Sequence, residues 1–241
     1  MPLGFRTAAL ASASAYLLAW ALLRLTLPQI QPSKQTGSGL DGLRRAAHDR
    51  RFRNFTLALI GYFVLSTQIN VAVTLRAVEL AGTAATGPLY ALSAGLAVVL
   101  QYPLLRLTER RLRPRTVLVA AVLTVALALA LMGYAQTFPA LLACVALYSL
   151  GTMLVFPMQQ TLTARFAPPE LAGSYFGFSA ISLGVGGAAG NFLGGSLIDL
   201  GHRLGQPALP WLILGATGLV TALSLRWALR ELPAAPEAAR N

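Results

Sequence analysis

Apolar residues form long uninterrupted runs along the chain, and charged residues are confined to the shorter segments between those runs. A run needs about 20 apolar residues to cross the hydrocarbon core of a bilayer as a helix. Seven segments meet this requirement, so the pattern predicts seven membrane-spanning helices. Their approximate bounds are 8–27, 54–75, 87–106, 116–135, 139–164, 173–199 and 210–230.

The connection over residues 28–53 is the one long segment between predicted spans. Its first part contains proline and glycine, and its second part reads "LRRAAHDRRFR". Arginines interleaved with apolar residues are typical of a short amphipathic helix that lies on a membrane surface. We expect such a helix before the second span.

The predicted span over 173–199 is unusually rich in glycine, and three of its glycines recur at intervals of four, at Gly186, Gly190 and Gly194. A glycine inside a helix in water costs about 1 kcal/mol relative to alanine, which argues against a soluble helix. In a bilayer the helix is held by its own hydrogen bonds, and glycine allows a neighbouring helix to approach closely. The pattern predicts a helix-packing stripe.

The composition supports a membrane protein, because 56% of the residues are hydrophobic and 11% are charged. Soluble domains carry about 25% charged residues. The net charge of +11 raises the question of a nucleic-acid partner, but the basic residues lie in loops between apolar spans. That placement favours the lipid bilayer as the partner and argues against nucleic acid.

Groups for enzyme chemistry are scarce in the sequence. The single cysteine, Cys144, lies within a predicted span, and both histidines lie in predicted loops or at span ends. Nucleophile, metal-cluster and phosphate-loop motifs are absent from the sequence. We therefore expect no catalytic residue, no metal site and no cofactor.

Loops with many basic residues alternate along the chain with loops that have few. Cytoplasmic loops of membrane proteins are enriched in Lys and Arg. Alternate loops hold single basic residues, Arg76 and Arg203. The loops after the first and third spans are therefore expected to be cytoplasmic, with the N-terminus outside and the C-terminus inside. The rich loops hold Lys34, Arg44, Arg45, Arg50, Arg51, Arg53, Arg110, Arg111, Arg113 and Arg115.

Several segments resemble the C-terminal half of a major facilitator superfamily transporter, and most closely its MdtH-type multidrug-resistance group of drug:proton antiporters. They are "RFRNFTLALIGYFVLSTQ", "YPLLRLTERRLRPR", "FPMQQTLTARFAPPELAGSYFGFS", "GGAAGNFLGGSLIDLG" and "LPWLILGATG". The resemblance implies an all-α integral membrane fold, a seven-helix portion of the transporter bundle. Residues 1–27 would be helix six, 28–53 the central cytoplasmic loop, 54–230 the C-terminal six-helix half, and 231–241 a cytoplasmic tail.

The resemblance also implies a function, proton-coupled efflux of small amphipathic or drug-like molecules across a bacterial inner membrane. An N-terminal half is then expected upstream, as a partner that this chain lacks, or a homodimer would have to rebuild the central cavity. The alternative is a membrane scaffold without transport activity, or a decayed transporter fragment. The two alternatives would differ in whether cavity-facing substitutions matter more than lipid-facing ones.

The loop after the third span resembles the family's cytoplasmic motif of an acid and arginines around a tight turn. Glu109 takes the position of the acid, followed by Arg110, while Arg113 and Arg115 fall near the later basic positions. The motif's glycine is missing. Two interpretations stay open: a latch that breaks when the bundle rocks, or a basic cytoplasmic loop with no further role.

Polar and aromatic residues on two predicted spans are candidates for a substrate cavity. On the second span, Tyr62, Ser66 and Asn70 follow each other at spacing four, while Gln68 points to another side. On the fifth span, a stripe is formed by Tyr148, Thr152, Phe156 and Gln159, with Met153 and Gln160 beside it. Aromatic and methionine side chains suit a promiscuous apolar pocket, but ordinary interhelical packing is the competing interpretation.

No Asp, Glu, His, Lys or Arg occupies the middle of the second to sixth predicted spans. Proton-driven antiport needs a titratable group inside the membrane. We therefore expect the proton site of a complete antiporter to lie outside this chain, and the chain alone to export nothing.

Overall fold

The computed structural model describes residues 3–26 and 39–230, and these residues form helices joined by short turns. The chain divides into two units, one ending at Thr36 and one beginning at Gly37. The first unit contains α1 (Leu3–Thr26), a helix of 24 residues over the first predicted span. Its Arg24 lies 5.2 Å from the ring centroid of Trp20. Whether α1 crosses a membrane stays a prediction.

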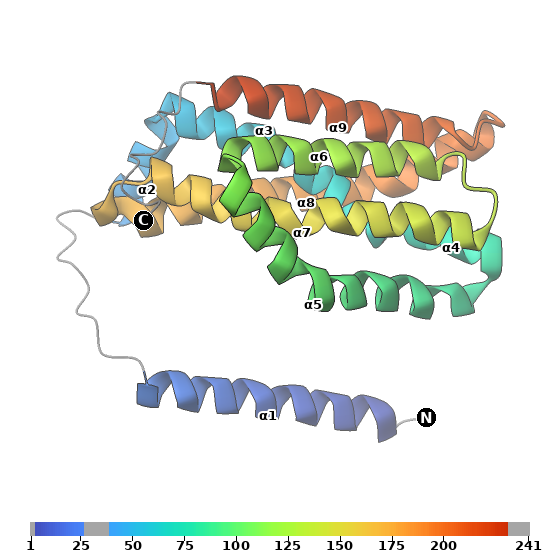
Figure 1. Cartoon of the computed structure of the whole chain (residues 1–241), viewed down its shortest axis with the longest axis horizontal. Coiled ribbons are helices and arrows are strands. Elements are labelled where there is room, and N and C mark those ends of the chain that lie inside the picture. The colour runs from blue at the N-terminus through green and yellow to red at the C-terminus, as the bar shows by residue number, and fades with distance from the viewer. Residues whose placement is uncertain (1–2, 27–38, 231–241) are drawn as a thin grey trace. The chain divides into compact units, whose positions relative to one another are not determined.

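The second unit is a bundle of helices (Figure 1). Six of its helical runs are long and apolar enough to cross a membrane: Arg50–Ala81, Thr83–Arg111, Pro114–Met132, Phe138–Phe166, Pro169–Arg203 and Leu209–Ala228. Its α-helices are α2 (Gly39–His48), α3 (Arg50–Ser66), α4 (Ala72–Ala81), α5 (Thr86–Arg111), α6 (Pro114–Met132), α7 (Phe138–Phe166), α8 (Ala172–Arg203) and α9 (Leu209–Ala228). Single 3-10 turns lie at η1 (Thr67–Ile69), η2 (Thr83–Ala85) and η3 (Pro169–Leu171).

Helix α2 lies where the sequence predicts a surface helix, within the long connection. Its small residues Gly42 and Ala46 are buried, and Gly42 lies against Ser174 of α8. α3 begins at Arg50, earlier than the predicted start at 54, because the Asp49 side chain accepts hydrogen bonds from the first free backbone N–H groups of α3. Residues 28–38 of the connection and the predicted tail over 231–241 lie outside the described residues.

The second predicted span is not one continuous helix, which corrects the expectation for residues 54–75. α3 ends at Ser66, η1 follows, and Val71 leaves helical geometry with φ −116° and ψ −83° before α4 begins. Backbone groups at such a break lose their helical partners and need others. The interruption therefore requires donors from neighbouring helices.

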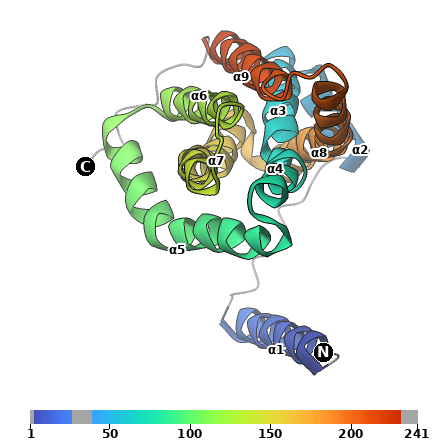
Figure 2. The ribbon, with the colours of Figure 1, turned by 90° about the vertical axis from the view of Figure 1, so that its right-hand side faces the viewer.

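The packing order explains how the bundle holds together. α6 packs against α7 and α9, α3 packs against α8 and α9, and α5 packs against α7. Viewed along the bundle, α7 lies inside an arc formed by α4, α5 and α6 (Figure 2). α5 contains Pro103 and bends strongly in the ribbon, as expected where a proline removes a main-chain hydrogen bond.

Aromatic rings close the end of the bundle that carries α2. Phe52 lies at the centre of this cluster, with its ring centroid 4.6 Å from that of Tyr175. The Tyr175 hydroxyl donates a hydrogen bond of 3.2 Å to the Asp49 carboxylate that also caps α3. The junction of α2 and α3 is thereby attached to α8.

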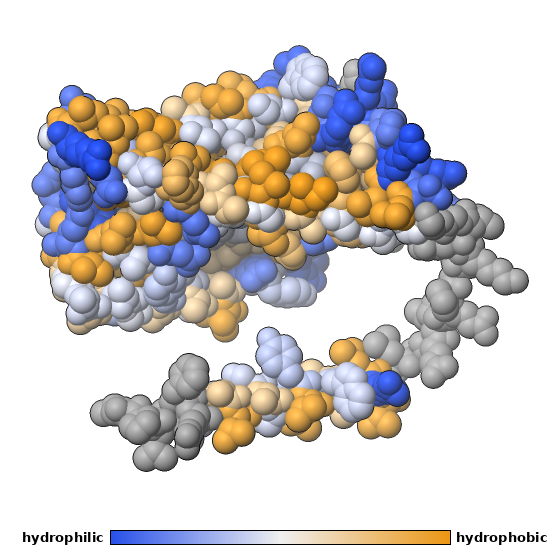
Figure 3. Space-filling view, turned by 180° about the vertical axis from the view of Figure 1, so that it is seen from behind, coloured by the Kyte–Doolittle hydropathy of each residue, from blue (hydrophilic) through white to orange (hydrophobic). Residues whose placement is uncertain are grey.

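Hydropathy is distributed as expected for a bundle inserted in a bilayer. On the face shown in Figure 3, hydrophobic and neutral residues cover the middle of the bundle, and the most hydrophilic residues gather toward its ends. Contacts between helices bury part of the apolar side chains, and lipid around the bundle would cover those on its outer surface.

Candidate functional site

An open pocket of about 330 Å³ lies where η1, α5 and α7 meet. Its position beside the break between α3 and α4 makes it the natural candidate for a ligand site, because irregular backbone within membrane spans is tolerated where it lines a cavity. The lining residues are Ser66, Ile69, Ser93, Ala97, Gln101, Tyr148, Ser149, Thr152, Met153 and Phe156.

Tyr148 connects the pocket to the break. It is almost fully buried, and its hydroxyl lies 2.7 Å from the Ser66 carbonyl oxygen and 3.1 Å from that of Leu65. Both carbonyls belong to the last turn of α3, and the Leu65 carbonyl also accepts from the Thr67 main-chain N–H. Tyr148 therefore both lines the pocket and stabilises the interrupted helix beside it.

Helix α5 supplies a wall of the pocket that was not predicted from the sequence. Ser93, Ala97 and Gln101 line the pocket from this helix. Ser149 of α7 donates a hydrogen bond of 3.1 Å to the Ser93 hydroxyl and so joins the two helices. Ser93, Ala97 and Gln101 follow each other at spacing four along the predicted third span. The same spacing indicated the stripe on α7, so these three residues could also have been predicted from the sequence.

The described residues that line the pocket carry hydroxyl, amide, thioether and aromatic groups, and no charge. Phe156 is 54% exposed, and Met153 lies buried beside it. Such a lining offers apolar contact together with donors and acceptors that do not select one charge. The arrangement suits small neutral or amphipathic ligands.

The predicted residues of α7 divide between the pocket and the interior. Tyr148, Thr152 and Phe156 line the pocket. Gln159 does not line it: its side chain is buried, and its carboxamide oxygen has no hydrogen-bond partner among the described residues.

Of the predicted residues of the interrupted span, Ser66 lines the pocket, whereas Tyr62, Gln68 and Asn70 do not. Tyr62 is buried and packs with its ring centroid 5.2 Å from that of Phe63. Gln68 is fully buried and donates hydrogen bonds to the carbonyl oxygens of Val64 and Gly190, at 2.6 and 3.0 Å. Its side chain therefore faces α8.

The predicted stripe from Tyr62 through Ser66 does not continue to Asn70 on one helical face. The helix ends before this residue, so the spacing of four no longer keeps it on the same face. Asn70 is exposed and accepts a hydrogen bond of 3.3 Å from the Tyr90 hydroxyl of α5. The same hydroxyl lies 3.1 Å from that of Thr74, so the three residues bridge α4 and α5.

The three glycines of α8 that recur at spacing four are all buried and face the interrupted helix. A Cβ added at Gly186 would lie 2.6 Å from the Ile60 carbonyl oxygen, and one at Gly190 would lie 2.7 Å from that of Val64. A Cβ at Gly194 would lie 2.5 Å from the Gln68 side-chain oxygen. At Gly186 and Gly190 the obstructing atoms include main-chain atoms, so a side chain there would push the two helices apart, whereas at Gly194 the Gln68 side chain would have to move.

The candidate latch residues lie around the turn between α5 and α6. Glu109, Arg110 and Arg113 are exposed, and Glu109 forms no ion pair within the described ranges. Arg115 is half-buried in the first turn of α6, where it lines a separate pocket with two arginines of the C-terminal end of α9. Among the described residues, Glu109 therefore makes no contact with the arginines around this turn that would form the predicted latch.

The opposite end of the bundle does contain an ion-pair network. The Arg76 guanidinium lies 3.0 Å from the Glu79 carboxylate and donates a hydrogen bond of 3.1 Å to the Ala135 carbonyl oxygen. The His202 ring nitrogen lies 3.3 Å from the same carboxylate. Side chains of α4 and α8 thereby meet the turn between α6 and α7.

Comparison with known proteins identifies a family match and several relatives. The sequence profile of the Major Facilitator Superfamily matches residues 2–191 and 89–241. The chain is 36% identical over 233 residues to the multidrug resistance protein MdtH of Sodalis glossinidius, an alignment that covers 96% of this chain and 58% of the relative. The corresponding protein of Photorhabdus laumondii is 38% identical over 214 residues, covering 88% of this chain and 53% of the relative.

The MdtH protein of Klebsiella pneumoniae is 36% identical over 213 residues, covering 88% of this chain and 50% of the relative. The chain spans about half the length of the curated relatives it matches. With six helices able to cross a membrane and bacterial relatives, it is a multi-pass bacterial inner-membrane protein. The all-helical bundle, the match to the family profile and these relatives together show that the chain belongs to the Major Facilitator Superfamily.

Proposed function

We propose that the chain is the C-terminal half of a major facilitator exporter, and that the pocket beside the helix break contributes one wall of its substrate cavity. The observation that carries the proposal is the uncharged lining around Tyr148, Thr152 and Phe156, which is open rather than enclosed. Transporters of this class bind substrate between two helical halves near the middle of the membrane. A second half would then close the open side.

The lining supports small amphipathic or drug-like molecules as substrates. Its aromatic and thioether groups adapt to different apolar shapes, and Gln101 and Thr152 offer hydrogen bonds without a fixed charge. The relatives are named multidrug resistance proteins, which agrees with a pocket of low selectivity. The chain is not proposed to be an enzyme.

Proton coupling, in this proposal, depends on a group outside the described residues. The charged residues of the described spans lie toward the ends of the helical runs, as with Arg76 and Glu79 in the run Arg50–Ala81 and Arg226 in the last turn of α9. A proton carrier must reach both sides of the membrane through the middle of the bundle. The upstream half is the expected location of that carrier.

The orientation proposed for the bundle places the turn between α5 and α6 in the cytoplasm. The basis is the set of arginines at that turn, since positively charged loops stay on the cytoplasmic side. The turn between α4 and α5 would then face the opposite side.

Transport of a lipophilic cationic dye tests the proposal. The chain is reconstituted in vesicles with an imposed pH gradient, alone and together with the portion of the Photorhabdus laumondii relative that it does not match. We expect dye movement from the pair and none from the chain alone. Phe156→Ala should lower the rate several-fold, because an exposed aromatic contact in the pocket is lost.

Phe192→Ala is the matched control, since Phe192 is 75% exposed on α8 and does not line the pocket. Equal effects of the two substitutions would show that the pocket is not the substrate site. Gradient-driven export by the chain alone would show that it, or its homodimer, is a complete transporter. Absence of export from the pair at normal folding yield would favour a scaffold.

A further inference from the structure

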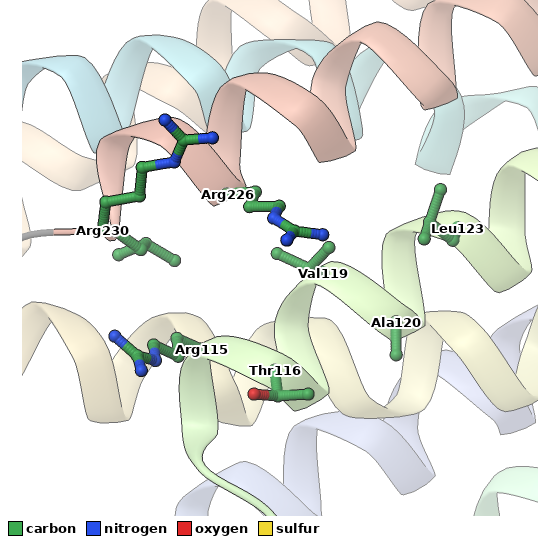
Figure 4. Close-up of a pocket in the computed structure, with 8 residues that line it drawn as sticks. Arg115, Thr116, Val119, Ala120, Leu123, Arg226 and Arg230 are labelled. Carbon is green, nitrogen blue, oxygen red and sulfur yellow. The ribbon is translucent and has the colours of Figure 1, made fainter.

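A second pocket, of about 610 Å³, lies between α6 and α9 at the end of the bundle opposite the Arg76 network. It is far larger than a gap between packed side chains and falls within the volume range of small-ligand sites. Its lining residues are Arg115, Thr116, Val119, Ala120, Leu123, Arg226, Leu229 and Arg230 (Figure 4).

Three arginines line this pocket without an acidic neighbour among its lining residues. In Figure 4 the Arg226 guanidinium lies between the two helices over Val119, and Arg115 projects from the first turn of α6 at the same open end. Arg230 is turned away from the gap. Within the described residues, none of the three guanidiniums takes part in a hydrogen bond or ion pair.

Arg115 and Arg226 have no ion-pair partner among the residues that the structure describes, so an anion between their guanidiniums would relieve the repulsion of two positive charges on one pocket. The start of α6 adds to the positive potential, because Arg113 at its N-cap provides no side-chain acceptor for the free N–H groups. Guanidinium groups bind phosphate oxygens with paired hydrogen bonds. The charge of the pocket therefore fits a phosphate.

The remaining walls are apolar and continue along α6 away from the arginines. Val119, Ala120 and Leu123 follow Arg115 along the helix, and Leu123 lies about 12 Å further along its axis at 1.5 Å per residue. Ala120 and Leu123 are exposed, so other residues of the bundle leave them largely uncovered. A soluble phosphate compound would gain nothing from this strip, whereas the acyl chain of a lipid would cover it.

Trp227 indicates that this end of α9 lies at the level of the lipid headgroups. Its ring is 61% exposed and lies next to Arg226 in the last turn of the helix. Exposed tryptophan is enriched at the boundary between headgroups and hydrocarbon. The arginines would then lie at the depth of the phosphates and the apolar strip at the depth of the acyl chains.

We infer that the pocket between α6 and α9 binds the phosphodiester headgroup of an anionic phospholipid, with one acyl chain along Val119, Ala120 and Leu123. Arg115 and Arg226 hold the phosphate from the two helices. The lipid would thereby join α6 to α9 at the end where their side chains leave a gap. This site is separate from the substrate pocket and does not depend on transport activity.

Native mass spectrometry of the full chain in non-ionic detergent measures the binding directly. Phosphatidylglycerol is compared with phosphatidylcholine, whose phosphate is balanced by choline, and inorganic phosphate is added in excess as a competitor. We expect a clear preference for phosphatidylglycerol that excess phosphate does not remove. Substitution of both Arg115→Gln and Arg226→Gln should weaken its binding roughly 25-fold, at about a fivefold loss for each arginine.

The matched control is the pair Arg106→Gln and Arg111→Gln, which removes the same charge from exposed arginines of α5. Ala120→Trp fills the apolar strip without changing the charge and should also reduce lipid binding. If the double variant folds poorly, Arg226→Gln alone serves, because this side chain is exposed.

Three results would overturn the inference. Equal losses in the two arginine pairs would indicate nonspecific attraction by net charge. Displacement of the lipid by inorganic phosphate, with no effect of Ala120→Trp, would indicate a site for soluble phosphate. Equal binding of phosphatidylcholine would indicate an ordinary lipid-filled groove.

Discussion

Gln68 donates a hydrogen bond of 3.0 Å from its side-chain nitrogen to the main-chain carbonyl oxygen of Gly190. The bond joins η1, where the second predicted span is interrupted, to the glycine-rich helix α8. It forms because the glycine lets the two backbones approach, and because the interruption turns Gln68 toward α8. The glycine stripe of α8 and the break in the second span therefore pack against each other and depend on each other.

Gly190→Ala should destabilise the protein by about 1–3 kcal/mol, because the added Cβ overlaps the backbone of α3. That Cβ would lie 2.7 Å from the Val64 carbonyl oxygen. Gly195→Ala is the matched control on the same helix, since a Cβ there meets no atom within 4 Å. The melting temperature in detergent, read from size-exclusion profiles after heating, compares the two. Similar losses would remove the packing explanation.

Tyr148→Phe should lower the free energy of unfolding by about 1–2 kcal/mol, because the hydrogen bonds that the buried hydroxyl donates to the end of α3 are lost. The native hydroxyl lies 2.7 Å from the Ser66 carbonyl oxygen. Tyr134→Phe removes a hydroxyl from a side chain that is 63% exposed and should have little effect. Thermal unfolding of both variants measures the difference. An unchanged Tyr148→Phe protein would mean that the break does not need this donor.

Arg76→Lys should destabilise the end of the bundle by about 1 kcal/mol, because one ammonium group does not reproduce the forked geometry of a guanidinium. Arg76 contacts Glu79 and the Ala135 carbonyl oxygen at the same time, through its two terminal nitrogens. Hydrogen exchange of the turn between α6 and α7 should increase. Arg203→Lys, at an exposed position, provides the comparison. Equal exchange in the two variants would contradict the bridging role of Arg76.

Cysteine labelling checks the proposed orientation in a Cys144→Ala background. Membrane-impermeant reagent added outside cells should label Thr83→Cys and Gln206→Cys and should not label Leu112→Cys. The neighbouring glycines Gly82 and Gly205 have φ of +74° and +64°, so substitution there would strain the backbone. Labelling of Leu112→Cys alone would reverse the orientation.

The spans and their charged ends were predictable from the sequence, because hydrophobic length is a local property of the chain. A short helix before the second span was predictable from its amphipathic pattern, although α2 covers Gly39–His48 and the last arginines of the predicted segment belong to α3. Gly186, Gly190 and Gly194 could be placed on one face of α8 from their spacing. The helix that they face could not be identified from that spacing.

Only the tertiary structure decided where the second span is interrupted and what surrounds the interruption. A break in a membrane helix depends on donors from distant segments, here the Tyr148 hydroxyl from α7. The break moved Asn70 away from the predicted stripe, and packing of α5 against α7 brought Gln101 to the pocket. Arg115 likewise met Arg226 through the contact of α6 with α9, because residues far apart in sequence become neighbours only when helices pack.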